Sequence, residues 1–307
     1  MSPFIPGEYC CFLFFFIASA RAQTLSMPTG IPLTTATVSA AASYDATKDM
    51  FSYTYSLANS TESVGEINSF YMDISTTPNG AALGSGGLQN TATRYYPVAT
   101  VLVTKVENAT IPVGFNSAPS GWTSGPTAQF TAGWFGPPDI LPGKSLGVFI
   151  LTSHGLPGIR RFVVKPAYDA SDFLPGIDDD SGEAQQIVDL DNEIQRMIQT
   201  RGYTIGPVQP PSLTDVGRLL DFVASLKHQA AALGWISGPG VEGVVQSLDA
   251  KLSAAKAALA RGDAKAAEGQ ITAFIDELEA QRGKHLNDDA FYMLQANAQF
   301  ILAKLGP

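Results

Sequence analysis

The spacing of apolar residues changes once along this chain, and that change constrains the fold more than any other feature. In residues 23–167 apolar side chains recur at every second position, as at Phe51 and Tyr53, which is the period of a half-buried strand. In residues 168–307 they recur three or four positions apart, as at Leu248 and Leu252, which is the period of a helix. The pattern predicts a multidomain chain, all-β first and all-α second.

The β-half is predicted to hold about seven short strands separated by turn-forming segments. Turn residues such as Gly and Pro gather at 77–80, 84–87, 136–138 and 141–144. Strands at this spacing favour an antiparallel β-sandwich of immunoglobulin-like architecture, whereas a jelly roll is the alternative that the sequence does not separate from it. The alternating segments are 33–40, 51–57, 70–74, 101–103, 130–134, 146–150 and 162–164.

The second half is predicted to be helical, and its helix ends are clearly marked. Residues 168–211 are expected to form an acidic linker with one helix that closes at Arg201–Gly202 and is followed by a Pro-rich break. Residues 212–307 are expected to form a four-helix antiparallel bundle, since short loops join its helices. Arg-Gly pairs at 261–262 and 282–283 suit helix C-termini. The predicted N-caps are Ser181, Thr214, Asp263 and either Asn287 or Asp288.

The stretch from Val216 to Leu305, about a third of the chain, resembles the FIMAH-type domain of secreted bacterial proteins. Residues 247–252 (SLDAKL), 262–263 (GD), 274–275 (FI), 279–284 (EAQRGK) and the closing Ile301 and Leu305 carry the resemblance. The sequence departs from the family pattern at 242–244 and at 285–286. The resemblance implies an exported bacterial protein with an accessory helical module, and it carries over no catalytic residue.

The N-terminus is predicted to be a signal peptide spanning residues 1–22. An apolar run at 10–18 is followed by an A-x-A pattern ending at Ala22, so cleavage is expected before Gln23. The region before the run carries Glu8 and no Lys or Arg, which is atypical for a signal. The only cysteines, Cys10 and Cys11, lie in this segment. We expect a secreted, periplasmic or cell-surface protein with no membrane span after signal removal.

Charge separates the two halves and bears on the partner. The formal net charge of −9 falls entirely on residues 168–307, because residues 23–167 carry equal numbers of acidic and basic side chains. An acidic protein repels the phosphates of nucleic acid. No nucleic-acid partner is therefore expected.

Three aromatic residues are the predicted ligand-binding residues of the sandwich. Trp122 lies in a Gly/Ser-rich loop, and Tyr95 and Tyr96 flank a predicted strand. Exposed aromatic rings on loops commonly contact glycans or protein partners. The alternative is that these rings cover the open end of the sandwich core.

An acidic cluster is the one predicted metal site. Asp178, Asp179 and Asp180 precede the predicted linker helix, and several carboxylates on a loop suit Ca²⁺. The alternative is a solvated linker whose acids favour the N-terminus of the following helix. Apart from this possibility of Ca²⁺, no cofactor is expected.

No catalytic motif emerges from the sequence. The three histidines, His154, His228 and His285, are far apart, and the pair Ser153–His154 lacks the G-x-S-x-G context of a nucleophile elbow. We therefore predict a non-enzymatic exported binding or adhesion protein whose sandwich loops contact an extracellular glycan or protein surface. Two alternatives stay open: an extracellular hydrolase or its accessory subunit, and a structural envelope component that associates through sheet edges.

Overall fold

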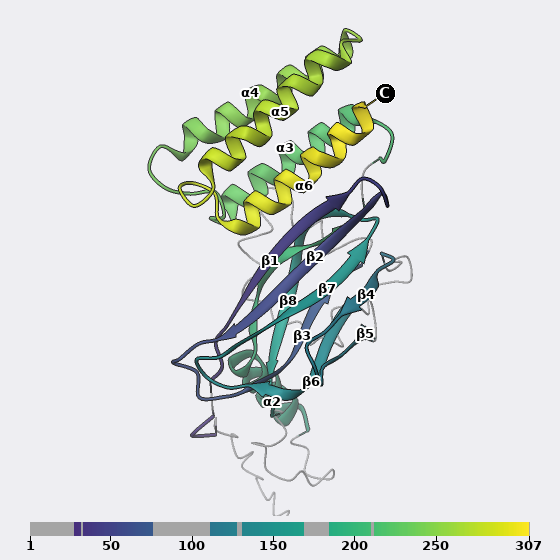
Figure 1. The fold of residues 1–307 in the computed structure, drawn as a ribbon. Helices are drawn as coiled ribbons and strands as arrows, with labels where there is room; N and C mark the ends of the chain where they lie inside the picture. The colour runs from purple at the N-terminus through teal and green to yellow at the C-terminus, as the bar shows by residue number, and fades with distance from the viewer. Residues whose placement is uncertain are drawn as a thin grey trace, which may run out of the picture.

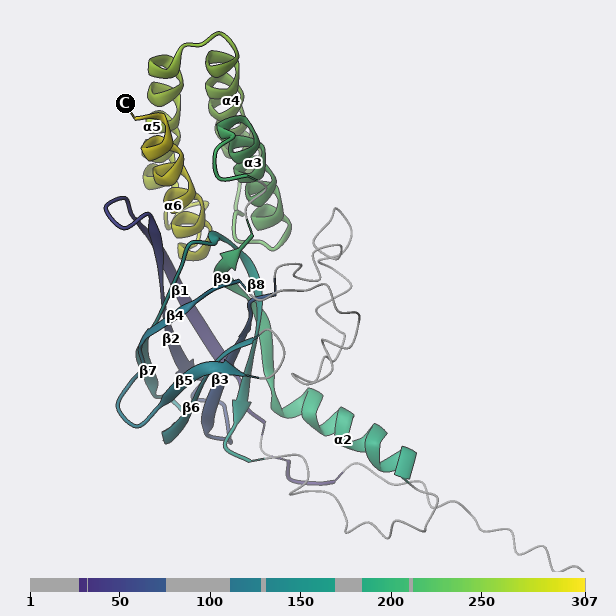
Figure 2. The ribbon, with the colours of Figure 1, turned by 90° about the vertical axis from the view of Figure 1, so that its right-hand side faces the viewer.

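The chain folds into a β-sandwich with a helical bundle seated on one of its ends (Figure 1). The computed structural model describes residues 28–31, 33–75, 111–127, 131–168, 184–209 and 212–306. Another helix, α2 (Ala184–Ile198), lies at the end of the sandwich opposite the bundle (Figure 2). The predicted fold class, an antiparallel sandwich followed by a helical bundle, is confirmed.

Among the described residues, the first sheet has four strands. They are β1 (Ala36–Asp45), β2 (Met50–Asn59), β7 (Ser145–Ser153) and β4 (Gly114–Ser117), and they lie side by side in the order β1-β2-β7-β4. Every neighbouring pair is antiparallel. Buried and exposed residues alternate along β1, so one face of the sheet meets the core and the other faces outward.

In the part of the chain that the structure describes, the second sheet has five strands in the order β5-β6-β3-β8-β9. Its members are β3 (Ile67–Asp73), β5 (Thr123–Thr127), β6 (Thr131–Ile140), β8 (Leu156–Pro166) and β9 (Thr200–Val208). The order β1-β2-β7-β4 facing β3-β8-β9 corresponds to the A-B-E-D and C-F-G sheets of an immunoglobulin sandwich. Strands β5 and β6 extend the second sheet beyond β3.

Aromatic rings from both sheets fill the space between them. Tyr55 and Phe149 come from the first sheet, and Phe70 and Trp134 come from the second. The Tyr55–Trp134 ring centroids are 5.6 Å apart, and those of Phe70 and Phe149 are 6.3 Å apart. Contacts of this kind add stabilisation beyond simple burial of area, which explains why the alternation of large apolar residues predicted these strands.

A strand inside the predicted linker range differs from the expectation. Residues 168–211 contain β9 as well as α2, and β9 pairs with β8 along its whole length. Arg201 and Gly202, predicted to close the linker helix, belong to β9 instead. Gly202 is needed there, because a Cβ at this position would lie 2.8 Å from the ring of Phe162. The sandwich therefore extends to Val208.

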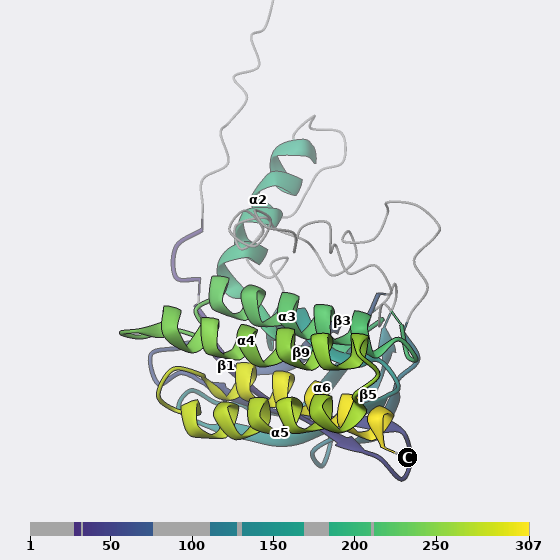
Figure 3. The same ribbon diagram turned by 90° about the horizontal axis from the view of Figure 1, so that it is seen from above.

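The four C-terminal helices pack as a bundle, seen from above in Figure 3. They are α3 (Val216–Ala232), α4 (Val241–Ala260), α5 (Ala264–Gln281) and α6 (Asp288–Leu305). Each helix contacts the next, and α3 also contacts α6. Gly262 and Gly283 follow α4 and α5 with positive φ values of 75° and 72°, as expected for the Arg-Gly helix ends.

Side-chain caps begin three of these helices. Asp263 caps α5 and Asn287 caps α6, as predicted. Helix α3 differs by one residue, since Asp215 rather than Thr214 accepts a hydrogen bond from the Arg218 backbone N–H at 3.1 Å. The carboxylate of Asp215 also suits the positive end of the helix dipole.

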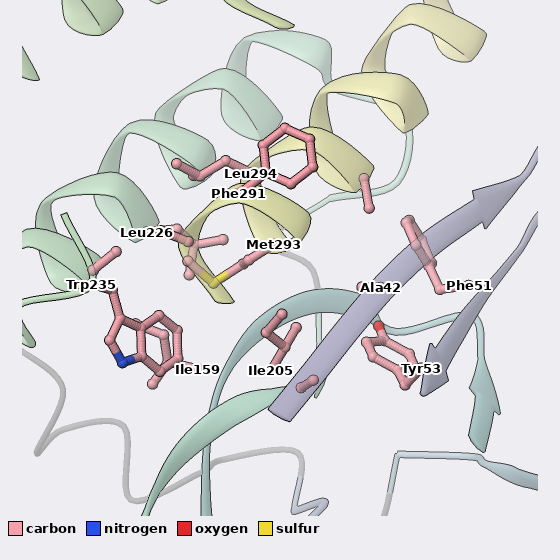
Figure 4. Close-up of a cluster of buried hydrophobic side chains, with 14 of the residues drawn as sticks. Ala42, Phe51, Tyr53, Ile159, Ile205, Leu226, Trp235, Phe291, Met293 and Leu294 are labelled. Atoms are coloured by element: carbon pink, nitrogen blue, oxygen red, sulfur yellow. The ribbon is translucent and has the colours of Figure 1, made fainter. Parts of the chain in front are cut away.

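The sandwich and the bundle share one hydrophobic core. Met293 of α6 points toward Ile205 of β9, and Trp235 of the bundle lies beside Ile159 of β8 (Figure 4). Strand β8 is buried on both faces over Leu156–Arg160 because the bundle covers its outer side. The helices therefore fix their position on the sandwich through packing.

Polar and aromatic contacts reinforce this junction. The buried Asn297 of α6 donates a hydrogen bond to the Pro157 carbonyl oxygen at 2.7 Å. The Phe300 ring lies 5.2 Å from Tyr44 and 5.5 Å from Phe51, centroid to centroid. At the end of α6, Lys304 pairs with Asp49.

Candidate functional site

A groove runs along the seam between the first sheet and the N-terminal end of α6. Its volume is about 420 Å³. Residues from three strands and one helix line it, so neither the sandwich nor the bundle forms it alone. The lining residues are Thr37, Val38, Ser39, Ala40, Ala41, Thr54, Tyr55, Ser56, Val148, Asn287, Asp288, Asp289 and Tyr292.

The floor of the groove is the outward face of the first sheet. Ser39 of β1 lies opposite Ser56 of β2, and Ala41 lies opposite Thr54. Cross-strand partners project from the same face of a sheet at close range. Because these side chains are short, the floor is a flat surface of hydroxyl and methyl groups. Val148 of β7 continues this surface.

The wall of the groove is the first turn of α6, held by a small polar network. Arg282 donates from Nε to Asp288 at 2.8 Å and from Nη2 to the Tyr292 hydroxyl oxygen at 2.7 Å. Its guanidinium also lies 4.5 Å from the ring centroid of Phe291 and 4.6 Å from that of Tyr292. Such cation–π stacking favours a fixed ring orientation. The Asp288 carboxylate raises the pKa of Arg282.

Asp289 is a carboxyl residue of the groove with a strongly altered acidity. Burial, and secondarily the charge of the adjacent Asp288, raises the pKa of the Asp289 carboxyl to about 7. Its Oδ1 atom is buried without a hydrogen-bond partner in the described part of the chain. The groove thus contains a carboxyl group that gains or loses its proton near neutral pH.

The predicted aromatic residue Trp122 does not lie on the surface. Its side chain is 7% exposed, its Nε1 donates to the Pro138 carbonyl oxygen at 3.0 Å, and its ring packs against Phe149. This location agrees with the alternative that Trp122 covers the end of the sandwich core. Tyr95 and Tyr96 lie outside the described residues, and a role of these rings in binding stays a prediction.

The predicted Ca²⁺ site also lies outside the described residues. Asp178, Asp179 and Asp180 fall between the described ranges 131–168 and 184–209, so calcium binding there stays a prediction. Within the described ranges, no three side chains of the metal-ligating types gather closely enough to hold an ion.

Ser153 and His154 do not act on one another. The Ser153 hydroxyl donates to the Pro112 carbonyl oxygen at 2.6 Å, whereas Nδ1 of His154 lies 2.7 Å from the Asp49 carbonyl oxygen. The adjacent pair is therefore engaged in two separate turns, and neither side chain is aligned as a nucleophile and its base.

Sequence reasoning did not find the groove. Asp288 and Asp289 read as ordinary acidic residues in the first turn of a helix, and Ser39 and Ser56 read as the solvent face of a strand. No local signal joins residues about 250 positions apart. Only the packing of α6 along β1 brings them together.

Comparison with known proteins identifies the helical part. Residues 220–303 match the FIMAH domain, which confirms the resemblance seen in the sequence. These residues run from α3 to α6 and include the wall of the groove. No curated protein matches the chain. None of the helices in the described ranges is long and apolar enough to cross a membrane.

Proposed function

We propose that this chain, whose C-terminal helices form a FIMAH domain, is an exported, non-enzymatic binding protein. The groove between the first sheet and α6 is its binding surface. The observation that carries this proposal is the composite origin of the groove, with a floor from the sandwich and a wall from the FIMAH domain. Because the two parts share one core, the groove is formed before any ligand arrives, which lowers the entropic cost of binding.

An extracellular glycan suits the groove better than a protein surface. Hydroxyl groups of Ser39 and Ser56 can donate and accept, and the carboxylates accept. The Asn287 Nδ2 group can donate, because its Oδ1 already accepts from the Ala290 backbone N–H. A sugar chain presents many hydroxyl groups that need such partners. Tyr292 adds an aromatic side chain on the same wall, and aromatic side chains offer an apolar body beside a polar tip.

The proposed surface replaces the sandwich loops expected from the sequence. Trp122 was the central residue of that expectation, and its ring is packed in the core. The groove instead uses a sheet face and a helix. Export itself stays part of the proposal, supported by the signal-like segment at 1–22. Sequencing the N-terminus of the exported protein tests it, with Gln23 as the expected first residue.

The binding test uses the full-length protein on immobilised polysaccharides and whole-cell surfaces. Ser39→Trp places a large ring on the floor and is expected to abolish retention. Ser43→Trp is the matched control, because Ser43 is exposed on the same strand, on the same face and outside the groove. Retention that survives Ser39→Trp, or is lost equally in both variants, contradicts the proposed surface.

An extracellular glycan hydrolase is the second candidate function, and Asp289 is the observation that favours it. A carboxyl whose pKa is near 7 is suited to general acid catalysis, and Asp288 supplies a second carboxylate beside it. The two candidates differ in their products. Release of new reducing ends from a retained polysaccharide, abolished by Asp289→Asn, would support the hydrolase. Retention without release supports the binding protein.

A further inference from the structure

A guanidinium group is sealed inside the sandwich with most of its hydrogen-bonding capacity unused. Arg160 lies on β8, on the inward face that also carries Phe162, and it is 1% exposed. Its Nε donates to the Pro207 carbonyl oxygen at 2.6 Å. Its Nη1 and Nη2 atoms are buried and have no acceptor in the described part of the chain.

A second unpaired polar group lies directly opposite. Thr204 of β9 is the cross-strand partner of Arg160, so the two side chains project into the same interior space. Thr204 is 0% exposed, and its Oγ1 also lacks a partner among the described residues. Two strands therefore bring three unsatisfied polar atoms to one buried place.

The neighbouring described groups give this charge no direct partner. Tyr53 and Tyr55 flank Arg160, yet their hydroxyl groups already donate to the carbonyl oxygens of Gly155 and Ile205. Asp73 acts on Arg160 only through space. Burial lowers the pKa of Arg160 to about 10, so the guanidinium remains charged at neutral pH.

A buried charge without a partner is strongly unfavourable, and native proteins satisfy it with a counter-charge or with ordered water. Water supplies hydrogen-bond acceptors but no compensating charge. We propose that a small monovalent anion occupies the sandwich interior, held by Nη1 and Nη2 of Arg160 and by the Thr204 hydroxyl group. This inference is independent of the groove and of what the groove binds.

The chemistry of the donors defines the anion. A single guanidinium is balanced by a single negative charge, and its parallel N–H groups match either a halide or one carboxylate group. Chloride and formate are the two sources of this chemistry, and both are tested. Because such an anion binds the folded state alone, it raises stability with its concentration.

The test is the melting temperature of the full-length protein at constant ionic strength. Chloride or formate replaces gluconate, a much bulkier monovalent anion that serves as the reference. When the concentration of the anion that binds, chloride or formate, reaches about a hundred times its dissociation constant, Tm should rise by about 4 °C. Arg160→Met should remove this response, whereas Arg218→Met, at an exposed arginine paired with Asp215, should keep it.

Two further measurements test the inference independently if Arg160→Met does not fold. Thr204→Val keeps the charge but removes one donor, so it should require a severalfold higher anion concentration for the same rise in Tm. Crystals grown in bromide should show an anomalous peak beside the Arg160 Nη atoms. Equal Tm values in chloride, formate and gluconate would overturn the inference, as would an unchanged response in Thr204→Val or bromide crystals without that peak.

Discussion

At the scale of single residues, Asp289 shows how tertiary packing changes chemistry that the sequence does not reveal. The Asp-Asp pair at the start of α6 looks like routine favourable placement at a helix N-terminus. The packing of α6 beside β1 buries one carboxyl group and leaves the other paired with Arg282. Two identical neighbours in the sequence therefore have different surroundings.

Asp289→Asn should remove a pH dependence of stability. The folded protein holds the Asp289 proton more tightly than the unfolded chain does, because burial raises its pKa from 3.8 to about 7. The contribution of this group to the free energy of unfolding is therefore full below pH ~4 and is lost as pH rises through ~7. The raised pKa sets an upper bound of about 4 kcal/mol, and the partial exposure of Asp289 reduces the expected effect to about 2 kcal/mol.

Denaturant unfolding of the wild type and the variant between pH 4 and pH 9 measures this effect. The variant should be more stable than the wild type at pH 8, and the difference should shrink as the pH falls. Asp276→Asn is the control, since Asp276 is an exposed carboxylate on α5. A constant difference across this pH range, or the same change in the control, would show that Asp289 titrates normally.

At the scale of elements, strands with regular alternation were predictable and strands without it were not. Phe51 to Leu57 alternate because one face of β2 meets the core, and the predicted strand matches β2. Strand β9 reads TRGYTIGPV, in which Gly and Pro suggest a loop. Pairing with β8 and close packing against Phe162 override that local preference. The ends of α4 and α5 were predictable because Gly and capping residues act locally, whereas the Arg-Gly pair at 201–202 lies in β9 and ends no helix.

Asn297→Ala tests the attachment of α6 to the sandwich. Asn297 is 2% exposed, and its loss leaves the Pro157 carbonyl oxygen without its donor and a small cavity beside it. We expect a loss of about 2 kcal/mol in the free energy of unfolding. Gln299→Ala, at an exposed position on the same helix, should change stability by less than about 0.5 kcal/mol. Equal effects in the two variants would mean that the junction contact contributes little.

At the scale of the whole molecule, the FIMAH domain and the sandwich share one hydrophobic core. The interior of the bundle continues into the sandwich through Met293, Ile205 and Ile159 (Figure 4). The period change near residue 167 correctly indicated two fold types. It did not indicate that they would share a core, because the junction is made by residues far apart in the sequence.

The shared core predicts a single cooperative unfolding transition. In a Trp235→Phe variant, which removes the tryptophan of the bundle, fluorescence reports on the sandwich through Trp122 and Trp134. Far-ultraviolet circular dichroism reports mainly on the helices. The two signals should change at the same temperature, and the calorimetric and van't Hoff enthalpies should agree. Two resolved transitions would show that the bundle and the sandwich unfold as independent domains.

The most direct test of the account is hydrogen exchange of the full-length protein with and without a polysaccharide that retains it. The central claim is that one ligand contacts both the sheet and the FIMAH domain. Ligand should slow exchange at residues 37–41 of β1 and at residues 287–292 of α6, which lie together in the groove. Ser39→Trp should abolish both effects. Protection confined to one of these segments, or to the sandwich loops alone, would contradict the claim.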